Sequence, residues 1–434
     1  MKRESFNSNL GFVLASAGAA VGLGNLWKFP YLAGNLGGGL FVLIYFVFLI
    51  VFGAPLMLSE MALGRYTEKS PFGAFETLKK GCGAVGSIGV LCAFIVLCFY
   101  SVVGGWVIRY FFGYLFGIVP DFDTFSANAL EPAAFHVLFA LLTFFIVLKG
   151  ISGGIEKISK LLLPALFVIL CILAIYAASL PGAKEGIEFF LVPRISNLSD
   201  LPKICINAMG QVFFSLSLGM GAIITYGSYL SKSANLPKNA VVIPVLDTAV
   251  AFLSGILILS AVFAFGLEPQ GGEGLLFRTM PAVFANLPFS RFWGALFFLM
   301  VFFAAITSSV SLLEVVTSFL MDTFRLKRSV SALIPIVLAL FIGALASLSF
   351  GILKPYTIAG YPFFTFLTVL TDKYFMPASA LLLCIFTGYV WDKRLLINEI
   401  TNRHKKAFRF EKAFLFVLRY AAPVTILIVF FMSL

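Results

Sequence analysis

Residues 18–30 read Gly-Ala-Ala-Val-Gly-Leu-Gly-Asn-Leu-Trp-Lys-Phe-Pro, and three glycines interrupt an apolar segment there. The surrounding segment, 10–36, is long enough to cross a bilayer, for which about 20 residues suffice. Backbone that leaves the helix at membrane depth must face protein or a water-filled cavity, because lipid offers no hydrogen-bond partner. The stretch therefore predicts a broken membrane helix beside a site. The alternative is that the glycines only let a neighbouring helix approach closely.

The composition is that of a polytopic membrane protein. Hydrophobic residues make up 60% and charged residues 12% of the 434, far from the proportions of soluble domains. The six cysteines have no ligand-like spacing, which argues against a disulfide framework and a zinc site. The apolar pattern predicts a single all-α membrane domain over 1–434 with eleven transmembrane helices, at 10–36, 40–63, 87–118, 133–148, 155–180, 201–230, 237–265, 292–324, 329–350, 361–390 and 413–433.

The charged residues indicate the orientation of the chain. With the N-terminus in the cytoplasm, 21 lysines and arginines fall on cytoplasmic segments and seven on external ones. The positive-inside bias therefore places the N-terminus in the cytoplasm, and eleven spans place the C-terminus outside. Because topology accounts for most of the +11 formal charge, nucleic acid is not an expected partner.

A second interruption lies five spans after the first. Residues 211–221 read Gln-Val-Phe-Phe-Ser-Leu-Ser-Leu-Gly-Met-Gly, so polar residues and glycines again fall at mid-membrane. An offset of five spans makes helices one and six run in opposite directions. Two broken helices in corresponding positions of inverted five-helix halves are the sequence pattern typical of a transporter site. The pattern predicts inverted repeats at 10–180 and 201–390, with 413–433 as an extra helix.

Broken helices offer the chemistry that an amino acid and a cation need. Half-helix N-termini favour anions, whereas freed carbonyls and hydroxyls suit a hard cation. Oxygen-bearing side chains at the right depth are those of Asn25, Ser215, Ser217, Asp247, Thr307 and Ser308. A lone membrane hydroxyl can instead bond its own i−4 carbonyl. Asp247 indicates function because a carboxylate within a span is costly, although an entrance position reached by water near Lys238 is an alternative.

Four stretches resemble the neurotransmitter:sodium symporters, in particular the short bacterial members with eleven spans. The stretches are 10–36, 60–66, 211–229 and 302–322, and the resemblance extends over nearly the whole chain. It implies a sodium-coupled symporter in the bacterial plasma membrane that works by alternating access and is not an enzyme. It also implies two sodium ions and an amino-acid substrate. It gives no expectation for the oligomeric state.

The resemblance also implies roles for individual residues. One sodium would bind carbonyls of Gly18, Val21 and Ala304 with the hydroxyls of Thr307 and Ser308. The other would bind the Ala20 carbonyl, Asn25, Ser215, Asp247 and the carboxylate of the substrate. The implied substrate-binding residues are Ala19, Ala20, Gly22, Gly24, Val96, Tyr100, Phe214, Ser215, Ser217, Met220, Ser308 and Leu312. Tyr100 could alternatively belong to an interfacial aromatic belt.

The same resemblance implies gates. Arg3 and Asp322 match the inner gate pair, with two unrelated surface charges as the alternative. Lys28 stands where relatives have arginine at the outer gate, and the matching helix-ten aspartate is Thr368, with Asp372 one turn further on. Lysine lacks the two-pronged fork of arginine, so the partner of Lys28 stays open.

Gly154 and Pro164, with nine residues between them, resemble a motif that lets helix five unwind at its cytoplasmic end. An ordinary proline kink is the alternative.

The pocket residues favour a large apolar guest, since Ser217 leaves room and Met220 can adapt its shape. The expected substrate is a hydrophobic or aromatic L-amino acid such as leucine, methionine, phenylalanine or tryptophan. Chloride independence is expected, because in chloride-dependent relatives the region of Asp247 is uncharged. Other hypotheses are a transport-inactive amino-acid sensor, a proton-coupled transporter in which Asp247 titrates, and an intramembrane enzyme. The last lacks a paired acid or His-Glu constellation within the spans.

Overall fold

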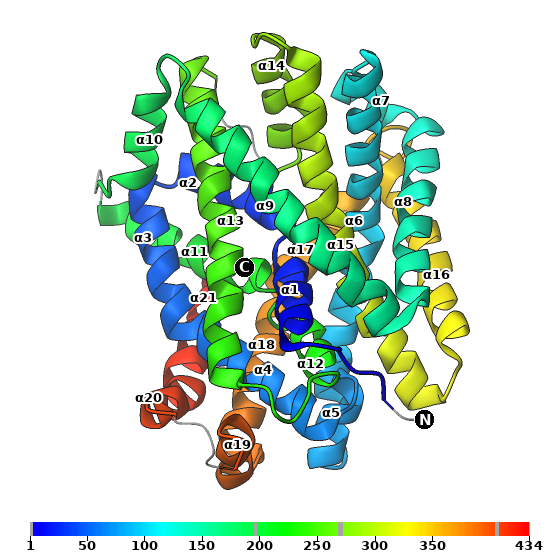
Figure 1. Ribbon diagram of the computed structural model, residues 1–434, viewed down its shortest axis with the longest axis vertical. Helices are drawn as coiled ribbons and strands as arrows, with labels where there is room; N and C mark the ends of the chain where they lie inside the picture. Colours follow the sequence, from blue (N-terminus) through cyan, green and yellow to red (C-terminus); the bar gives the residue numbers. More distant parts are fainter. Residues whose placement is uncertain (1–2, 195–197, 268–271, 404–407, 434) are drawn as a thin grey trace.

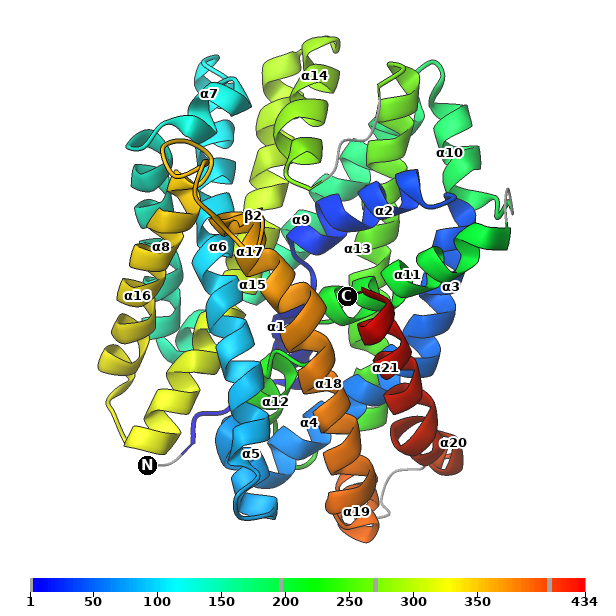
Figure 2. The ribbon, with the colours of Figure 1, turned by 180° about the vertical axis from the view of Figure 1, so that it is seen from behind.

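The computed structural model describes residues 3–194, 198–267, 272–403 and 408–433. Its helices run between two ends of the molecule (Figures 1 and 2). The end that holds the N-terminus also holds α5 (Pro71–Leu78), α19 (Lys393–Ile400) and α20 (Glu411–Phe416). At the opposite end lie α7 (Phe122–Ala127), α10 (Ala183–Leu191) and α14 (Met280–Ala285).

Within the described residues, nine helices are long and apolar enough to cross a membrane. Five of them are single α-helices, one is an α-helix after a short π-helical start, and three contain internal π-helical turns. In chain order the nine are Gly39–Thr67 (α3 Gly39–Phe48, η2 Leu49–Gly53, α4 Ala54–Thr67), α6 (Gly83–Phe116), α8 (Glu131–Leu148), Ile151–Ala178 (η3 Ile151–Glu156, α9 Lys157–Ala178), α13 (Leu236–Ala264), α15 (Ser290–Phe324), α16 (Arg328–Leu348), Phe363–Val390 (α17 Phe363–Val369, η6 Leu370–Phe375, α18 Met376–Ile385, η7 Phe386–Val390) and Glu411–Met432 (α20, η8 Val417–Ala421, α21 Ala422–Ser433).

The first predicted span is a bent pair. Asn9–Ala20 (α1) and Gly24–Asn35 meet at 53°, and the second part consists of η1 (Gly24–Lys28) and α2 (Phe29–Asn35). Counted as one span, the pair raises the number to ten in the described part of the chain. The predicted sixth span is not among them. Two short helices, α11 (Leu201–Ser215) and α12 (Ala222–Gly227), occupy its place, because non-helical backbone separates them.

The segments expected as plain loops contain short elements. Besides α5, α7, α10, α14 and α19 these are η4 (Leu198–Asp200), η5 (Leu275–Thr279), and the two-stranded hairpin of β1 (Thr357–Ile358) and β2 (Tyr361–Pro362). The hairpin moves the start of the tenth predicted span from 361 to 363. Asp121 caps α7, since its carboxylate accepts from the Thr124 N–H and hydroxyl, and these bonds lower its pKa.

The long helices fall into two groups around the broken ones. α6, α8, α15 and α16 pack against one another, and α8 and α16 form one flank of the molecule (Figure 2). α13 packs against α9 and α10 on another side. α1 lies between the groups and contacts both α13 and α15. This arrangement places the interruption of the first span at the centre of the protein.

Candidate functional site

The interruption after α1 exposes backbone groups to the centre of the protein. α1 ends at Ala20, and Val21 is extended with φ −65° and ψ 108° before η1 begins at Gly24. Val21 and Leu23 are fully buried, so lipid does not reach this backbone. The break predicted from the glycines is therefore confirmed.

The interruption between α11 and α12 contains three residues with a left-handed backbone conformation. Ser217, Gly219 and Gly221 have φ of 52°, 76° and 74°. Glycine adopts this conformation at no steric cost, but serine pays a penalty that its surroundings must offset. The Ser217 hydroxyl donates to the Ala19 carbonyl at 2.9 Å, and the Gly219 N–H donates to the buried Glu60 carboxylate at 2.8 Å. Sequence reasoning gave Glu60 no role, although its position within an apolar run was a signal.

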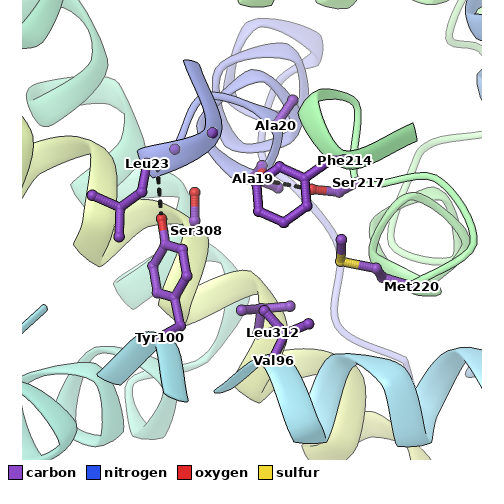
Figure 3. A pocket seen from close by; sticks show the side chains of 12 residues that line it. Ala19, Ala20, Leu23, Val96, Tyr100, Phe214, Ser217, Met220, Ser308 and Leu312 are labelled. Carbon is purple, nitrogen blue, oxygen red and sulfur yellow. Dashed lines mark hydrogen bonds between the residues drawn. The ribbon is translucent and has the colours of Figure 1, made fainter. Parts of the chain in front are cut away.

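A small cavity of about 30 Å³ lies between the two interruptions (Figure 3). Eleven of the twelve predicted substrate-binding residues line it, with Ser215 the exception and Leu23 the addition. Tyr100 lies inside the protein rather than in an interfacial belt, and its hydroxyl accepts from the Leu23 N–H at 3.1 Å. The lining residues are Ala19, Ala20, Gly22, Leu23, Gly24, Val96, Tyr100, Phe214, Ser217, Met220, Ser308 and Leu312.

Two of the glycines are required by space. A Cβ on Gly22 would lie 2.7 Å from the Ser308 hydroxyl and 2.8 Å from the Tyr100 hydroxyl. A Cβ on Gly24 would lie 2.5 Å from the Phe214 ring. Without side chains, Gly22 and Gly24 bring the backbone of the first interruption to the wall of the cavity, where the Gly22 N–H donates to Asn25 Oδ1 and the Leu23 N–H to the Tyr100 hydroxyl. The apolar side chains of Val96, Met220 and Leu312 line the remainder.

Asp247 forms the centre of a buried polar cluster. Its side chain is wholly buried, which excludes the alternative of a water-reached entrance position. Its two carboxylate oxygens accept from Asn25 Nδ2 at 2.8 Å and from Ser215 Oγ at 2.6 Å. Among the described residues no cationic side chain forms an ion pair with it. A buried carboxylate without a cationic partner is costly and creates a favourable place for a metal cation.

A second group of oxygens joins α1 to α15. The Ser308 hydroxyl donates to the carbonyls of Gly18 and Val21 at 3.3 and 3.0 Å. Thr307 Oγ1 lies 3.1 Å from the Ala304 carbonyl and 3.0 Å from the Phe303 carbonyl. The Thr307 hydroxyl thus bonds carbonyls of its own helix, as the alternative for a lone membrane hydroxyl expected, whereas the Ser308 hydroxyl bonds carbonyls of the first broken helix. All five predicted ligands meet here, and a Cβ on Gly18 would lie 3.2 Å from the Thr307 Cβ.

An ion pair closes the end of the molecule that holds the N-terminus. Arg3 Nη1 binds both carboxylate oxygens of Asp322, at 2.7 and 2.8 Å. Arg3 also donates to the Ser228 hydroxyl, and its guanidinium lies 4.7 Å from the centre of the Tyr229 ring. Asp322 accepts in addition from the Ser70 N–H at 2.6 Å. The predicted pair is therefore in contact and is not two unrelated charges.

At the other side of the cavity Lys28 pairs with Asp372. Lys28 Nζ lies 2.5 Å from Asp372 Oδ2 and 4.3 Å from the centre of the Phe214 ring, which lines the cavity. Thr368 donates to the Thr365 carbonyl of its own helix instead. The partner left open by the sequence is thus Asp372, one helical turn beyond the expected position.

Gly154 and Pro164 lie in the first half of the long helix Ile151–Ala178, the fifth predicted span. Gly154 belongs to the π-helical turn η3, and Pro164 lies inside α9, so the helix is wound through both residues. The next carboxylate, Glu156, accepts from the Asn7 N–H at 2.7 Å and from the Ser8 hydroxyl at 3.0 Å. The start of this helix is therefore bound to the segment that precedes α1.

Comparison with known proteins gives consistent matches. The model of the sodium:neurotransmitter symporter family matches residues 3–121 and 131–434. An uncharacterized sodium-dependent transporter of Bacillus subtilis is 36% identical over 99% of this chain and 97% of its own length. The sodium- and chloride-dependent GABA transporter 2 of Mus musculus is 29% identical, over 79% of this chain and 67% of its length. The crystal structure of MhsT in complex with L-phenylalanine superposes with a TM-score of 0.92 at 39% identity, and the match covers 100% of both chains.

Proposed function

The chain belongs to the sodium:neurotransmitter symporter family, and from this premise we propose that it is a sodium-coupled symporter that imports an amino acid by alternating access. The family is one of transporters and not of enzymes. The observation that carries the proposal is the cavity between the two helix interruptions, whose wall joins the glycine backbone of the first interruption and the Tyr100 residue to apolar side chains. Such a wall suits a guest with a carboxylate at one end and a hydrocarbon group at the other.

The proposed substrate is a hydrophobic or aromatic L-amino acid. Its carboxylate would lie at Gly22, Gly24 and Tyr100, and its ammonium at carbonyls of the two interruptions, including Ala19 and Ala20. The solved relative with TM-score 0.92 holds L-phenylalanine, which supports this class. The cavity of about 30 Å³ has room for a water molecule or two. Substrate binding therefore requires side chains such as Phe214 and Met220 to move.

We assign the two oxygen clusters to two sodium ions. Asn25, Ser215 and Asp247, with the Ala20 carbonyl and the substrate carboxylate, would form the first site. Gly18, Val21, Ala304, Thr307 and Ser308 would form the second. All of these are hard oxygen ligands, as a hard cation prefers. A carboxylate shared between substrate and the first ion couples the two binding events, because each lowers the cost of the other.

Transport is proposed to be independent of chloride. The Asp247 carboxylate is fixed beside the first ion site, where it can balance the sodium charge that an anion balances elsewhere. Its hydrogen bonds from Asn25 and Ser215 hold it in place. The GABA transporter 2 of Mus musculus is sodium- and chloride-dependent, so the comparison alone does not favour either outcome.

The gates and the topology belong to the same proposal. Arg3 and Asp322 form the inner gate, and Lys28 with Asp372 the outer one. The N-terminus is cytoplasmic and the C-terminus external in a bacterial plasma membrane. The chain contains inverted repeats at 10–180 and 201–390, with the extra helix at 413–433. Unwinding between Gly154 and Pro164 opens the inner path, which requires release of the Glu156 contacts with Asn7 and Ser8.

Uptake into proteoliposomes tests the function. We expect labelled phenylalanine to accumulate under an inward sodium gradient and not when choline replaces sodium at the same pH. Binding without accumulation would indicate a transport-inactive sensor, and uptake that follows a proton gradient in choline would indicate proton coupling. Preferential competition by lysine or glutamate would contradict the proposed substrate class.

A further inference from the structure

A second cavity opens on the outer side of the group formed by α6, α15 and α16. Its volume is about 270 Å³, and three of its residues, Leu91, Ile334 and Leu338, are 46%, 39% and 48% exposed. Nine of the ten lining residues are apolar. The lining consists of Ser87, Val90, Leu91, Phe94, Val316, Phe319, Leu320, Ile334, Pro335 and Leu338.

This groove is suited to hydrocarbon and not to water or an amino acid. Its only polar side chain is Ser87, whose hydroxyl already donates to the Gly83 carbonyl at 3.4 Å. An ordered water needs two to four polar partners, and an amino acid needs partners for two charged ends. Because the groove opens on the flank of membrane-spanning helices, the guest reaches it from the bilayer.

The inner end of the groove is bordered by aromatic rings. The Phe319 ring, which lines it, lies 5.8 Å from the Phe72 ring of α5 and 6.0 Å from the Phe324 ring at the end of α15. Beyond this border the chain is basic. Lys79 and Lys80 precede α6, and Arg325 and Lys327 connect α15 to α16.

These four side chains, here called the basic rim, are exposed, and no ion pair within the described residues involves them. The neighbouring acids are engaged elsewhere. Asp322 binds Arg3, and Glu314 binds Arg328. Glu76 accepts from the Gly81 and Gly83 N–H groups, and the charge of nearby Lys80 also contributes to lowering its pKa. The positive charge of Lys79, Arg325 and Lys327 therefore remains available to an anion at the membrane surface.

We propose that the groove holds one acyl chain of an anionic phospholipid, with the phosphate of the head group on the basic rim. The proposal rests on the cytoplasmic orientation of this end of the molecule. An apolar groove that leads to unpaired cations matches both parts of such a lipid. Each lysine or arginine near the membrane surface raises the affinity for anionic lipid about fivefold.

Native mass spectrometry of the full-length protein tests this, with phosphatidylglycerol compared with phosphatidylcholine of the same acyl chains. We expect the wild type to retain one phosphatidylglycerol preferentially. In the rim variant Arg325→Gln/Lys327→Gln, the preference for phosphatidylglycerol over phosphatidylcholine should fall about fivefold for each removed charge. The matched control Arg394→Gln/Lys412→Gln removes two exposed charges near α19 and α20, at the same end of the molecule, and should keep the preference.

Filling the groove tests the acyl chain separately. Leu338→Trp should reduce retention of the first lipid several-fold, whereas Val245→Trp, at a comparably exposed site on α13, should not. Equal retention of both lipids by the wild type, or equal losses in a test variant and its control, would overturn the proposal. Because the measurement records lipid binding and not uptake, its failure is distinct from failure of the proposed transport.

Discussion

At the scale of single residues, the shape of the cavity depends on the absence of a side chain at Gly22. A Cβ at this position would come closest to the hydroxyls of Ser308 and Tyr100, and the backbone N–H of Leu23 also donates to Tyr100. A methyl group at this position would separate the first broken helix from the residues that complete the cavity. If the cavity holds the proposed substrate, we expect its affinity to be sensitive to the smallest possible substitution here.

We expect Gly22→Ala to weaken amino-acid binding about tenfold or more, because overpacking a tight contact costs about 1–3 kcal/mol. Equilibrium binding of labelled phenylalanine in saturating sodium measures this. Gly210→Ala is the control, since a Cβ there meets nothing within 4 Å. Equal affinities of the two variants would show that the cavity at Gly22 does not hold the substrate.

Asp247 supports a second prediction at this scale. Asp247→Asn removes the only charge of its cluster. Sodium affinity should therefore fall about 10- to 100-fold, because an interaction with a charged group contributes about 1.5–3 kcal/mol. The sodium dependence of phenylalanine binding measures the change.

In the wild type, uptake of phenylalanine in chloride-free gluconate medium should equal uptake in chloride medium, because the Asp247 carboxylate is proposed to take the place of chloride. A fall to background in gluconate would end the proposal of chloride independence.

At the scale of elements, the two interruptions depend on each other. Ser217 of the second donates to Ala19 of the first, and Gln211 of α11 donates to the Gly24 carbonyl at 3.1 Å. Backbone groups freed in one broken helix are thus bonded by side chains of the other. Neither interruption would be satisfied in an isolated helix within lipid.

The ion pair proposed as the outer gate joins two elements, η1 with Lys28 and η6 with Asp372. We expect Asp372→Asn to change the apparent affinity for phenylalanine by less than about fivefold, because a partly exposed ion pair contributes about 0.2–1 kcal/mol. Reversing both charges, Lys28→Glu with Asp372→Lys, should recover part of the loss in a double-mutant cycle.

Thr368→Ala provides the matched comparison for this gate, since Thr368 bonds its own helix. Its uptake kinetics should match those of the wild type. A larger effect of Thr368→Ala than of Asp372→Asn would return the gate to the position expected from the family.

At the scale of the whole molecule, contacts of the N-terminal segment close one end. Arg3 joins the loop after α12 to the end of α15, and the Phe6 N–H donates to the Tyr229 carbonyl at 3.1 Å. Asn7 and Ser8 bind Glu156 of the long helix Ile151–Ala178. Opening toward the N-terminal end must break this set of contacts together, whereas the Lys28 and Asp372 pair can remain.

We expect Asp322→Asn to favour the open form of this end by about fivefold, the equivalent of about 1 kcal/mol for the loss of a partly exposed two-point ion pair. Hydrogen exchange at the amides of Phe6 and Asn7 should accelerate correspondingly, because closure protects both. Asp123→Asn, which breaks an ion pair with Arg278 at the opposite end, is the control. Unchanged exchange in Asp322→Asn would contradict a gating role for the pair.

The sequence by itself determined the two interruptions and most of the cavity wall. Glycine and polar residues inside apolar spans leave few interpretations, because lipid does not tolerate unpaired backbone. The resemblance of the surrounding stretches then assigned eleven of the twelve residues that line the cavity. The short helices between the spans were not predicted, since their amphipathic patterns are too brief to separate from loops.

Only the tertiary structure decided which distant side chains meet. Thr368 and Asp372 are four residues apart and share one face of a helix, so the sequence could not choose between them as partners of Lys28. It likewise could not show that Glu60 binds the Gly219 N–H or that Asp247 is wholly buried. Which residues meet depends on how far one helix is displaced along its neighbour. A displacement of one helical turn, about 5.4 Å, keeps the same faces of the two helices in contact but gives each side chain a different partner.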